Sequence, residues 1–198
     1  MLRLALTGGI ATGKSYVARR LREAGVPLVD ADVLAREAVA PGSSGLAAVV
    51  KRFGDGILTA RGELDRARLA AVVFADPDAR RDLEAIIHPE VRRRIAEFFE
   101  TLPSDTRLAV ADIPLLFEGH RAGAFDKVLV VACAPSTQIH RIMARDQLPR
   151  EAAEQRLAAQ LPIEEKVARA DFVIRTDGTH EETDAQLAAL LASLRGLL

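Results

Sequence analysis

The sequence predicts a three-layer α/β fold, in which helices cover both faces of a five-stranded parallel sheet. Five short apolar runs are typical of strands that are buried on both faces. Helical patterns separate these runs, and this alternation favours parallel strands joined by crossover helices. The runs lie at residues 2–6, 26–29, 108–111, 128–132 and 172–174.

The composition narrows the classes of protein to consider. The chain has 198 residues and a formal net charge of −1, from 27 basic and 28 acidic residues. This length fits one domain with an inserted lobe, and the balanced charge argues against strong nucleic-acid binding. No apolar run approaches the roughly 20 residues that cross a bilayer, and no signal-peptide pattern is present. We therefore expect a cytoplasmic protein, a monomer rather than an oligomer, with neither a membrane nor a nucleic-acid partner.

The loop after the first apolar run has the spacing of a phosphate-binding loop. Residues 8–15 match G-x-x-x-x-G-K-[ST], and a helical pattern follows them directly. Glycine tolerates the tight curl that turns several N–H groups toward one phosphate, and a helix start adds further donors. Lys14 would reach the β- and γ-phosphates of a nucleotide, and the Ser15 hydroxyl would bind Mg²⁺. A chance glycine turn is the alternative, and the strand–loop–helix context argues against it.

Two aspartates follow the second predicted strand. Asp30 suits the N-cap of a helix that runs to about Val39, and Asp32 would lie in its first turn, where the helix dipole favours negative charge. A carboxylate here could instead orient an acceptor hydroxyl and accept its proton during phosphoryl transfer. Arg36 shares the helix face of Asp32 and could pair with it or bind a substrate phosphate. Both interpretations stay open on the residues alone.

A long helical stretch separates the second predicted strand from the third. It has roughly 75 residues, too many for a simple crossover. We interpret residues 40–101 as an inserted helical lobe, which could carry a second substrate or merely complete the core. His88-Pro89 indicates a helix break, with Pro89 first in the next helix and His88 mainly structural. The apolar stripes of the lobe are Leu46, Val49, Val50 and Phe53, then Leu69, Val72, Val73 and Phe74, then Ile86, Ile87, Val91, Ile95, Phe98 and Phe99.

Polar residues also follow the third predicted strand. Asp112 stands where enzymes with a phosphate-binding loop often place an acidic residue near Mg²⁺, directly or through water. Leu115, Leu116 and Phe117 either pack in the core or wall a substrate pocket. Ligands of doubly wound sheets bind beyond the carboxyl ends of the strands. We therefore expect residues 112–118, 30–32 and 8–15 to meet at one sheet edge.

Two arginines late in the chain share one helix face. Arg141 and Arg145 are four residues apart, and their like charges repel, so an anion between them would relieve this cost. An arginine-bearing lid over a triphosphate would stabilise transition-state charge and exclude water. A solvated surface role is the alternative. Cys133 lies in an apolar run and is expected to be a small buried hydrophobe, whereas His120, His140 and His180 lack metal-ligand spacing.

Together these segments resemble the dephospho-CoA kinase family. The resemblance covers essentially the whole chain in order, although the glycine loop alone would indicate only a P-loop phosphotransferase. The segments that carry it are Thr7-Gly8-Gly9-Ile10, Gly13-Lys14-Ser15, Asp30-Ala31-Asp32, Ala35-Arg36, Pro41-Gly42, Ile87-His88-Pro89, Pro114-Leu115-Leu116-Phe117-Glu118, Arg141, Arg145-Asp146-Gln147 and Ala170-Asp171-Phe172-Val173-Ile174.

The resemblance implies transfer of the ATP γ-phosphate to the ribose 3′-hydroxyl of dephospho-CoA, the last step of CoA synthesis. It implies a P-loop NTPase fold similar to nucleoside monophosphate kinases, with a core at 1–39, 102–135 and 170–198, a helical CoA-side insertion at 40–101 and a lid at 136–169. Asp32 would be the catalytic base, with Lys14 and Arg141 acting on phosphate and Ser15 on Mg²⁺. The other residues implied for ATP are Gly8, Gly9, Ile10, Ala11, Thr12, Gly13, Tyr16 and Arg145, and those for dephospho-CoA are Asp32, Arg36, His88, Pro114, Leu115 and Leu116.

The sequence departs from the family pattern at two places. The loop reads Ile10-Ala11-Thr12-Gly13 where the family usually has Ile-Gly-Ser-Gly, and the side chain of Ala11 leads us to expect an ordinary backbone conformation there. After the last predicted strand, Arg175-Thr176-Asp177-Gly178 replaces a common Asp-Asn-x-Gly pattern. This second departure affects the expected contacts with adenine rather than the reaction.

Two alternative functions share the glycine loop. Another P-loop small-molecule kinase or a nucleoside monophosphate kinase would have the same donor site and a different acceptor lobe. A GTPase-type switch would specify guanine through an Asn-Lys-x-Asp loop, and the chain contains no asparagine. The switch is therefore disfavoured.

Overall fold

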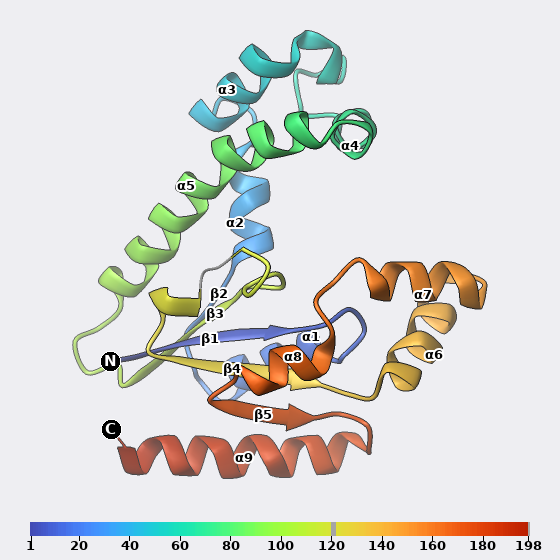
Figure 1. The fold of residues 1–198 in the computed structure, drawn as a ribbon. Coiled ribbons are helices and arrows are strands. Elements are labelled where there is room, and N and C mark those ends of the chain that lie inside the picture. Colours follow the sequence, from blue (N-terminus) through green and yellow to red (C-terminus); the bar gives the residue numbers. More distant parts are fainter. Residues whose placement is uncertain (120–121, 198) are drawn as a thin grey trace. The chain divides into compact units, whose positions relative to one another are not determined.

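The computed structural model describes residues 1–119 and 122–197, and the side chains of these residues up to 194 (Figure 1). A five-stranded sheet has the order β2-β3-β1-β4-β5, and β1 pairs in parallel with β3 and with β4, as β4 does with β5. The predicted parallel α/β fold is confirmed. His120, considered above for metal-ligand spacing, lies outside the described residues. The strands are β1 (Leu2–Gly8), β2 (Leu28–Asp30), β3 (Leu108–Asp112), β4 (Lys127–Ala132) and β5 (Phe172–Arg175).

The central strand β1 brings the functional loop to the carboxyl edge of the sheet. Leu6 of β1 lies beside Asp112 at the end of β3, and Gly8 lies beside Val131 near the end of β4. The apolar runs of these strands are buried because α1 (Lys14–Glu23) and α9 (His180–Leu197) pack on the sheet. Their shared core contains Leu4, Leu6, Val17, Leu21, Leu129, Leu187 and Leu194.

Three helices follow β4. They are α6 (Pro135–Asp146), α7 (Arg150–Ala158) and α8 (Ile163–Ala168). In Figure 1 the arrows of β1, β4 and β5 point toward the side on which α6 and α7 stand. Pro135 opens α6, and Gln147 closes it with a left-handed φ of 54°. This turn lets α7 pack against α6.

The chain divides into two compact units. The sheet unit comprises Met1–Val29 with Leu102–Leu198, and the helical unit comprises Asp30–Thr101. The helical unit thus begins earlier than the residue 40 expected for the insertion. Its helices are α2 (Ala31–Ala38), α3 (Ser44–Phe53), α4 (Arg66–Ala75) and α5 (Pro77–Thr101), with a short 3₁₀ turn at Asp55–Ile57; the sheet unit has another at Ala122–Ala124.

The helix break expected at His88-Pro89 is wrong. Helix α5 continues through Pro89, which lies inside it. Proline removes one hydrogen bond and usually kinks or ends a helix. Here Leu83 and Ile87 before Pro89 pack against the core of the helical unit, Val91 after it is buried, and α5 packs against α2, α3 and α4. Tertiary packing therefore outweighs the local cost of the proline.

The apolar stripe expected on α4 is only partly correct. Leu69 is buried and Val73 packs against the same core, which also contains Val39, Val49 and Ile57. Val72 is 42% exposed and Phe74 is 87% exposed. Successive residues on a helix point about 100° apart, so three in a row cannot share one face.

No helix among the described residues has the length and the apolar character that a membrane span requires.

Candidate active site

The glycine loop connects β1 to α1, and close packing explains two of its glycines. A Cβ on Gly8 would lie 2.6 Å from the carbonyl oxygen of Val131, and a Cβ on Gly9 would lie 2.7 Å from Nε2 of Gln138. Gly13, the residue before α1, has a φ of 83°, which favours glycine. The loop therefore curls tightly at the end of β1, as phosphate binding by backbone N–H groups requires.

The conformation of Ala11 corrects the expectation from the sequence. Its φ is 58°, in the left-handed region, rather than an ordinary value. The tight curl explains it, because the Thr12 N–H bonds to the Gly9 carbonyl at 3.3 Å and closes a turn around Ala11. A Cβ in this region crowds the neighbouring carbonyl and costs about 1–2 kcal/mol. The surroundings of Ala11 must offset that strain.

Lys14 and Asp112 form an ion pair beneath the loop. The Nζ of Lys14 lies 2.5 Å from Oδ1 of Asp112, whose residue is only 3% exposed. A carboxylate buried this far needs charged or hydrogen-bonding partners. The pair links the start of α1 to the end of β3, whereas Ser15 beside it is exposed. A cation and a carboxylate thus meet at the sheet edge, and Ser15 directly follows the cation in the chain.

Arg141 of α6 lies against the same loop. Its Nη1 donates to the Ala11 carbonyl at 3.3 Å, and its Nη2 donates to the Thr176 carbonyl at 2.5 Å. The Thr176 hydroxyl in turn donates to the Thr12 carbonyl at 2.7 Å. The structure therefore brings Arg141 to the loop, where its guanidinium donates hydrogen bonds to protein oxygens.

Arg145 and Tyr16 direct their side chains to other partners. Arg145 forms two hydrogen bonds with Asp146, to which Arg156 also binds. The Tyr16 hydroxyl donates to Asp184 at 3.0 Å, and its ring stacks on His180 with centroids 4.3 Å apart. Desolvation and the bond to Asp184 raise the pKa of Tyr16. Arg145 thus pairs with the neighbouring Asp146 carboxylate, whereas Arg141 donates to the carbonyl oxygens of Ala11 and Thr176.

The segment after β3 packs onto β1. The Thr7 hydroxyl donates to the Pro114 carbonyl at 3.1 Å. Leu116 and Phe117 are buried, whereas Leu115 is 45% exposed. Of the apolar residues considered for a substrate pocket, Leu115 therefore presents the largest accessible surface.

Glu118 and Lys166 form a second ion pair, with 2.6 Å between Nζ and Oε1. The side chain of Lys166 is fully buried, and the same Glu118 oxygen accepts the Leu161 N–H at 3.2 Å. Burial is the largest single influence and raises the pKa of Glu118, but the interaction with Lys166 and the backbone hydrogen bonds together outweigh it, so the pKa lies below its usual value. The pair anchors the chain between α7 and α8 to the segment after β3.

Two glutamines from this part of the chain contact Ile10. The Ile10 N–H donates to Oε1 of Gln160 at 2.8 Å, and Nε2 of Gln138 donates to the Ile10 carbonyl at 2.6 Å. Gln138 is 1% exposed. Its own Oε1 is buried and meets no donor among the described residues. The backbone N–H and carbonyl of Ile10 are thus both hydrogen-bonded to glutamine side chains.

The helical unit contains a pocket with charged side chains. Asp30 caps α2, accepting from the N–H groups of Asp32 and Val33, so the expected N-cap is confirmed. Asp32 and Arg36 both line the pocket and are exposed, and His88 lies half-buried in α5 beside the pocket residue Ile87. The apolar lining is Ala35, Val39, Leu64, Leu69, Ala70, Val73, Leu83 and Ile87.

Comparison with known proteins identifies the family. The family model of dephospho-CoA kinase matches residues 2–182. A dephospho-CoA kinase of Geobacillus kaustophilus is 47% identical over 191 residues, which are 96% of this chain and 95% of that protein. The chain belongs to the dephospho-CoA kinase family. The solved dephospho-CoA kinase from Campylobacter jejuni has a TM-score of 0.76 and 28% identity, covering 99% and 98% of the two chains.

The P-loop kinase fold extends beyond dephospho-CoA kinases. A shikimate kinase from Bacteroides thetaiotaomicron has a TM-score of 0.53 and 14% identity, covering 98% of each chain. Such a likeness shows the fold alone, so the substrate must be argued from the site.

Thr176 and Asp177 show how the chain uses its departure from the family pattern. Thr176 is 6% exposed and bonds to both Thr12 and Arg141. Asp177 accepts from the Ala134 N–H at 2.7 Å and from the Thr137 hydroxyl at 3.2 Å, next to the start of α6. The turn after β5 therefore braces the glycine loop and α6. Cys133 beside it is buried as expected, and burial raises the pKa of its thiol.

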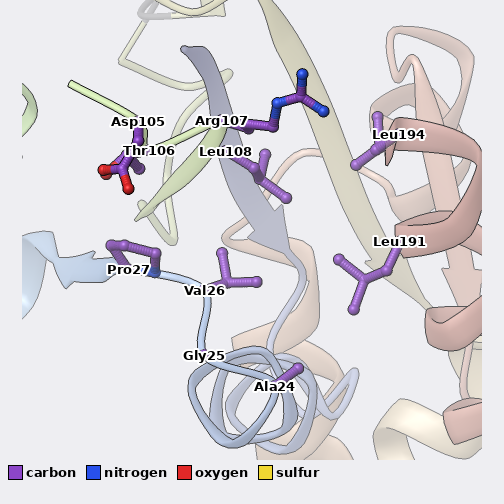
Figure 2. Close-up of a pocket in the computed structure, with 10 residues that line it drawn as sticks. All are labelled: Ala24, Gly25, Val26, Pro27, Asp105, Thr106, Arg107, Leu108, Leu191 and Leu194. Atoms are coloured by element: carbon purple, nitrogen blue, oxygen red, sulfur yellow. The ribbon is translucent and has the colours of Figure 1, made fainter. Parts of the chain in front are cut away.

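A pocket elsewhere in the sheet unit lies at the opposite edge of the sheet. Residues 24–27 and 105–108, which precede or begin β2 and β3, line it with Leu191 and Leu194 of α9. In Figure 2, Val26 lies above the end of α1 and Leu108 above Val26, with Leu191 and Leu194 of α9 to the right of both. Ligands of open α/β sheets bind at the carboxyl edge, so this pocket is not the kinase site.

Proposed function

We propose that this chain transfers the γ-phosphate of ATP to the ribose 3′-hydroxyl of dephospho-CoA, binding ATP at the glycine loop and orienting the hydroxyl with Asp32. The observation that carries the proposal is the Gly8–Ser15 loop, which directs Lys14 to Asp112 at the carboxyl edge. The same edge collects Arg141. Family membership supplies the reaction class.

The donor side supplies positive charge and backbone donors. The curled loop and the start of α1 offer N–H groups to the phosphates, and Lys14 neutralises charge on the β- and γ-phosphates. Arg141, already at the loop, stabilises the charge that develops during transfer. Helices α6 and α7 act as the lid and exclude water.

The family reaction implies Mg²⁺, and the residues present fit it. Mg²⁺ prefers oxygen ligands and usually takes one or two from the protein with the rest from phosphates and water. The exposed Ser15 hydroxyl would bind it, and the Asp112 carboxylate would approach it directly or through water. No cluster of three His, Cys, Asp or Glu side chains suited to a metal occurs in the part of the chain that the structure describes. When bound, the ion neutralises phosphate charge.

The acceptor side is the pocket of the helical unit. Its apolar lining suits the pantetheine arm of dephospho-CoA, and Arg36 and Arg66 suit its pyrophosphate. Asp32 lies two residues after β2, a strand that ends at the carboxyl edge of the same sheet as β1. Its carboxylate accepts the hydroxyl proton as the bond to phosphorus forms and ADP leaves.

An acceptor screen tests the substrate. ADP release from ATP would be measured with dephospho-CoA, AMP, shikimate and no acceptor. We expect ADP release to depend on dephospho-CoA. Rapid phosphorylation of AMP or shikimate, with none of dephospho-CoA, would support the alternative small-molecule kinase.

Paired substitutions test the role of Asp32. Asp32→Asn should lower kcat by about 10²-fold with a smaller effect on the KM for ATP, since general base catalysis contributes on that scale. Asp30→Asn should keep most activity, because asparagine is an equally good N-cap. Steady-state kinetics of both variants decides, and loss of activity in Asp30→Asn alone would reverse the two roles. The cytoplasmic location and the monomeric state stay predictions.

A further inference from the structure

The surroundings of Ala11 assign a role to two residues that the reaction chemistry does not use. We propose that Gln138 and Gln160 are positioning residues, which hold the loop on either side of Ile10 so that Ala11 keeps the left-handed conformation needed for ATP binding. This inference rests on the nucleotide site proposed above. It does not depend on Asp32 or on the acceptor.

The contacts of the two glutamines are complementary. Gln160 accepts the Ile10 N–H at 2.8 Å, and Gln138 donates to the Ile10 carbonyl at 2.6 Å. The Ile10 carbonyl belongs to the peptide that directly precedes Cα of Ala11, so Gln138 fixes the plane that helps to define the φ of Ala11. Arg141 holds the following carbonyl, that of Ala11, at 3.3 Å. The peptides before and after the strained residue are therefore both hydrogen-bonded to side chains.

A strained conformation persists only where its surroundings hold it. Ala11 has a φ of 58°, and without restraint an alanine would favour negative φ values. A change of φ at Ala11 would rotate the Ile10 peptide and break its bond to Gln138. The two glutamines thus oppose the relaxation that the side chain of Ala11 favours.

The burial of Gln138 argues for positioning rather than for stability. Its Oε1 is buried and meets no donor among the described residues, which is unfavourable for folding. Gly9 makes room for the amide, because a Cβ there would lie 2.7 Å from Nε2. The buried Oε1, without a donor in the described part of the chain, and the glycine required at position 9 are both unfavourable for stability. The compensating feature is the hydrogen bond from Gln138 to the Ile10 carbonyl.

Gln160 is held in place by the buried ion pair. The next residue, Leu161, donates its N–H to Glu118 at 3.2 Å, and Lys166 binds the same Oε1 at 2.6 Å. Gln138 lies on α6, and Gln160 follows α7. Motion of α6 and α7 consequently acts on the loop at Ile10, so these helices influence ATP binding through the backbone of the loop.

A double-mutant cycle tests this role. Gln160→Met removes the acceptor from a half-buried site and keeps the side-chain length. We expect it to raise the Kd for ATP, measured by calorimetry, about tenfold. Without the bond to Gln160, Ala11 can relax to a negative φ, and the loop then leaves the conformation that binds ATP. In an Ala11→Gly background the same substitution should raise the Kd only about twofold, since glycine adopts a positive φ freely. The matched control is Gln155→Met on the exposed surface of α7, which should leave the Kd unchanged.

Each outcome decides the inference. Thermal unfolding of every variant confirms that it is folded, and a merely structural role would lower the melting temperature by the same amount in the wild-type and Ala11→Gly backgrounds. An unchanged Kd in Gln160→Met, or an equal loss of affinity in both backgrounds, would overturn the proposal. Failure of the wild-type protein to bind ATP would instead refute the nucleotide site itself.

Discussion

Both units have an apolar core, but different kinds of contact shape the glycine loop of the sheet unit and the pocket of the helical unit. In the sheet unit, hydrogen bonds between residues far apart in sequence fix single loop atoms, as Gln160 does for the Ile10 N–H. In the helical unit, an apolar core including Val49 and Leu69 shapes the pocket, and ion pairs such as Arg52–Asp82 lie half-exposed on the outside. Directional bonds fix individual atoms of the glycine loop, whereas packing provides an accommodating apolar surface. Substitutions should therefore affect the two units differently.

The largest effect is expected for the ion pair of Lys14 and Asp112 in the sheet unit. Lys14→Ala should lower kcat by about 10³-fold, because it removes the cation that we propose neutralises the β- and γ-phosphates in a preorganised site. It also leaves Asp112 buried without that cation, so a modest loss of stability is expected. Steady-state kinetics and thermal unfolding of the same sample measure both effects.

Lys51 provides the matched control for this prediction. It lies exposed in the last turn of α3, in the helical unit. Lys51→Ala should keep wild-type kinetics and stability within error. A Lys14→Ala protein that retains a near-normal rate would remove Lys14 from the mechanism.

A pH-dependent stability difference is expected at Glu118. Glu118→Gln should lower the free energy of unfolding by about 3 kcal/mol at pH 7, because Lys166 stays buried without its counter-charge. The pKa of Glu118 is lowered from 4.5 in the folded protein. The pair therefore stabilises the fold fully above the unfolded pKa, and this stabilisation is lost as pH falls through the lower folded pKa. The difference between the two proteins should shrink steadily below about pH 4.5.

Urea unfolding at pH 7, 5 and 3 measures this difference. Glu165→Gln is the control, on α8 next to Lys166. Glu165 pairs with Arg169 at 3.6 Å, and both side chains are more than half exposed. It should change stability by less than about 0.5 kcal/mol. A Glu118→Gln deficit that stays constant down to pH 3 would show that the charge of Glu118 is not its cause.

Local patterns account for what the sequence predicts well. The five strands, the glycine loop and the Asp30 cap depend on residues that are neighbours in the chain. The conformation of Ala11 was missed because its left-handed φ is held by Gln138 and Gln160, and no sequence pattern links them to Ile10 across 128 and 150 positions. The break at Pro89 was wrong because packing along α5 decided its course. Lys166 also has no local signal, since its partner lies in another segment.

The smallest effects are expected on α4, where the core boundary separates two apolar residues. Leu69 is 6% exposed and lines the pocket of the helical unit, where we propose that the acceptor binds, whereas Phe74 is 87% exposed. Leu69→Ala should lower the free energy of unfolding by about 2–3 kcal/mol and raise the KM for dephospho-CoA, because it leaves a cavity at the pocket wall. Phe74→Ala should change stability by less than about 0.5 kcal/mol, since its ring is already in water. Urea unfolding compares them, and equal losses would mean that the ring of Phe74 is covered in solution, so that α4 presents a wider apolar face than its burial indicates.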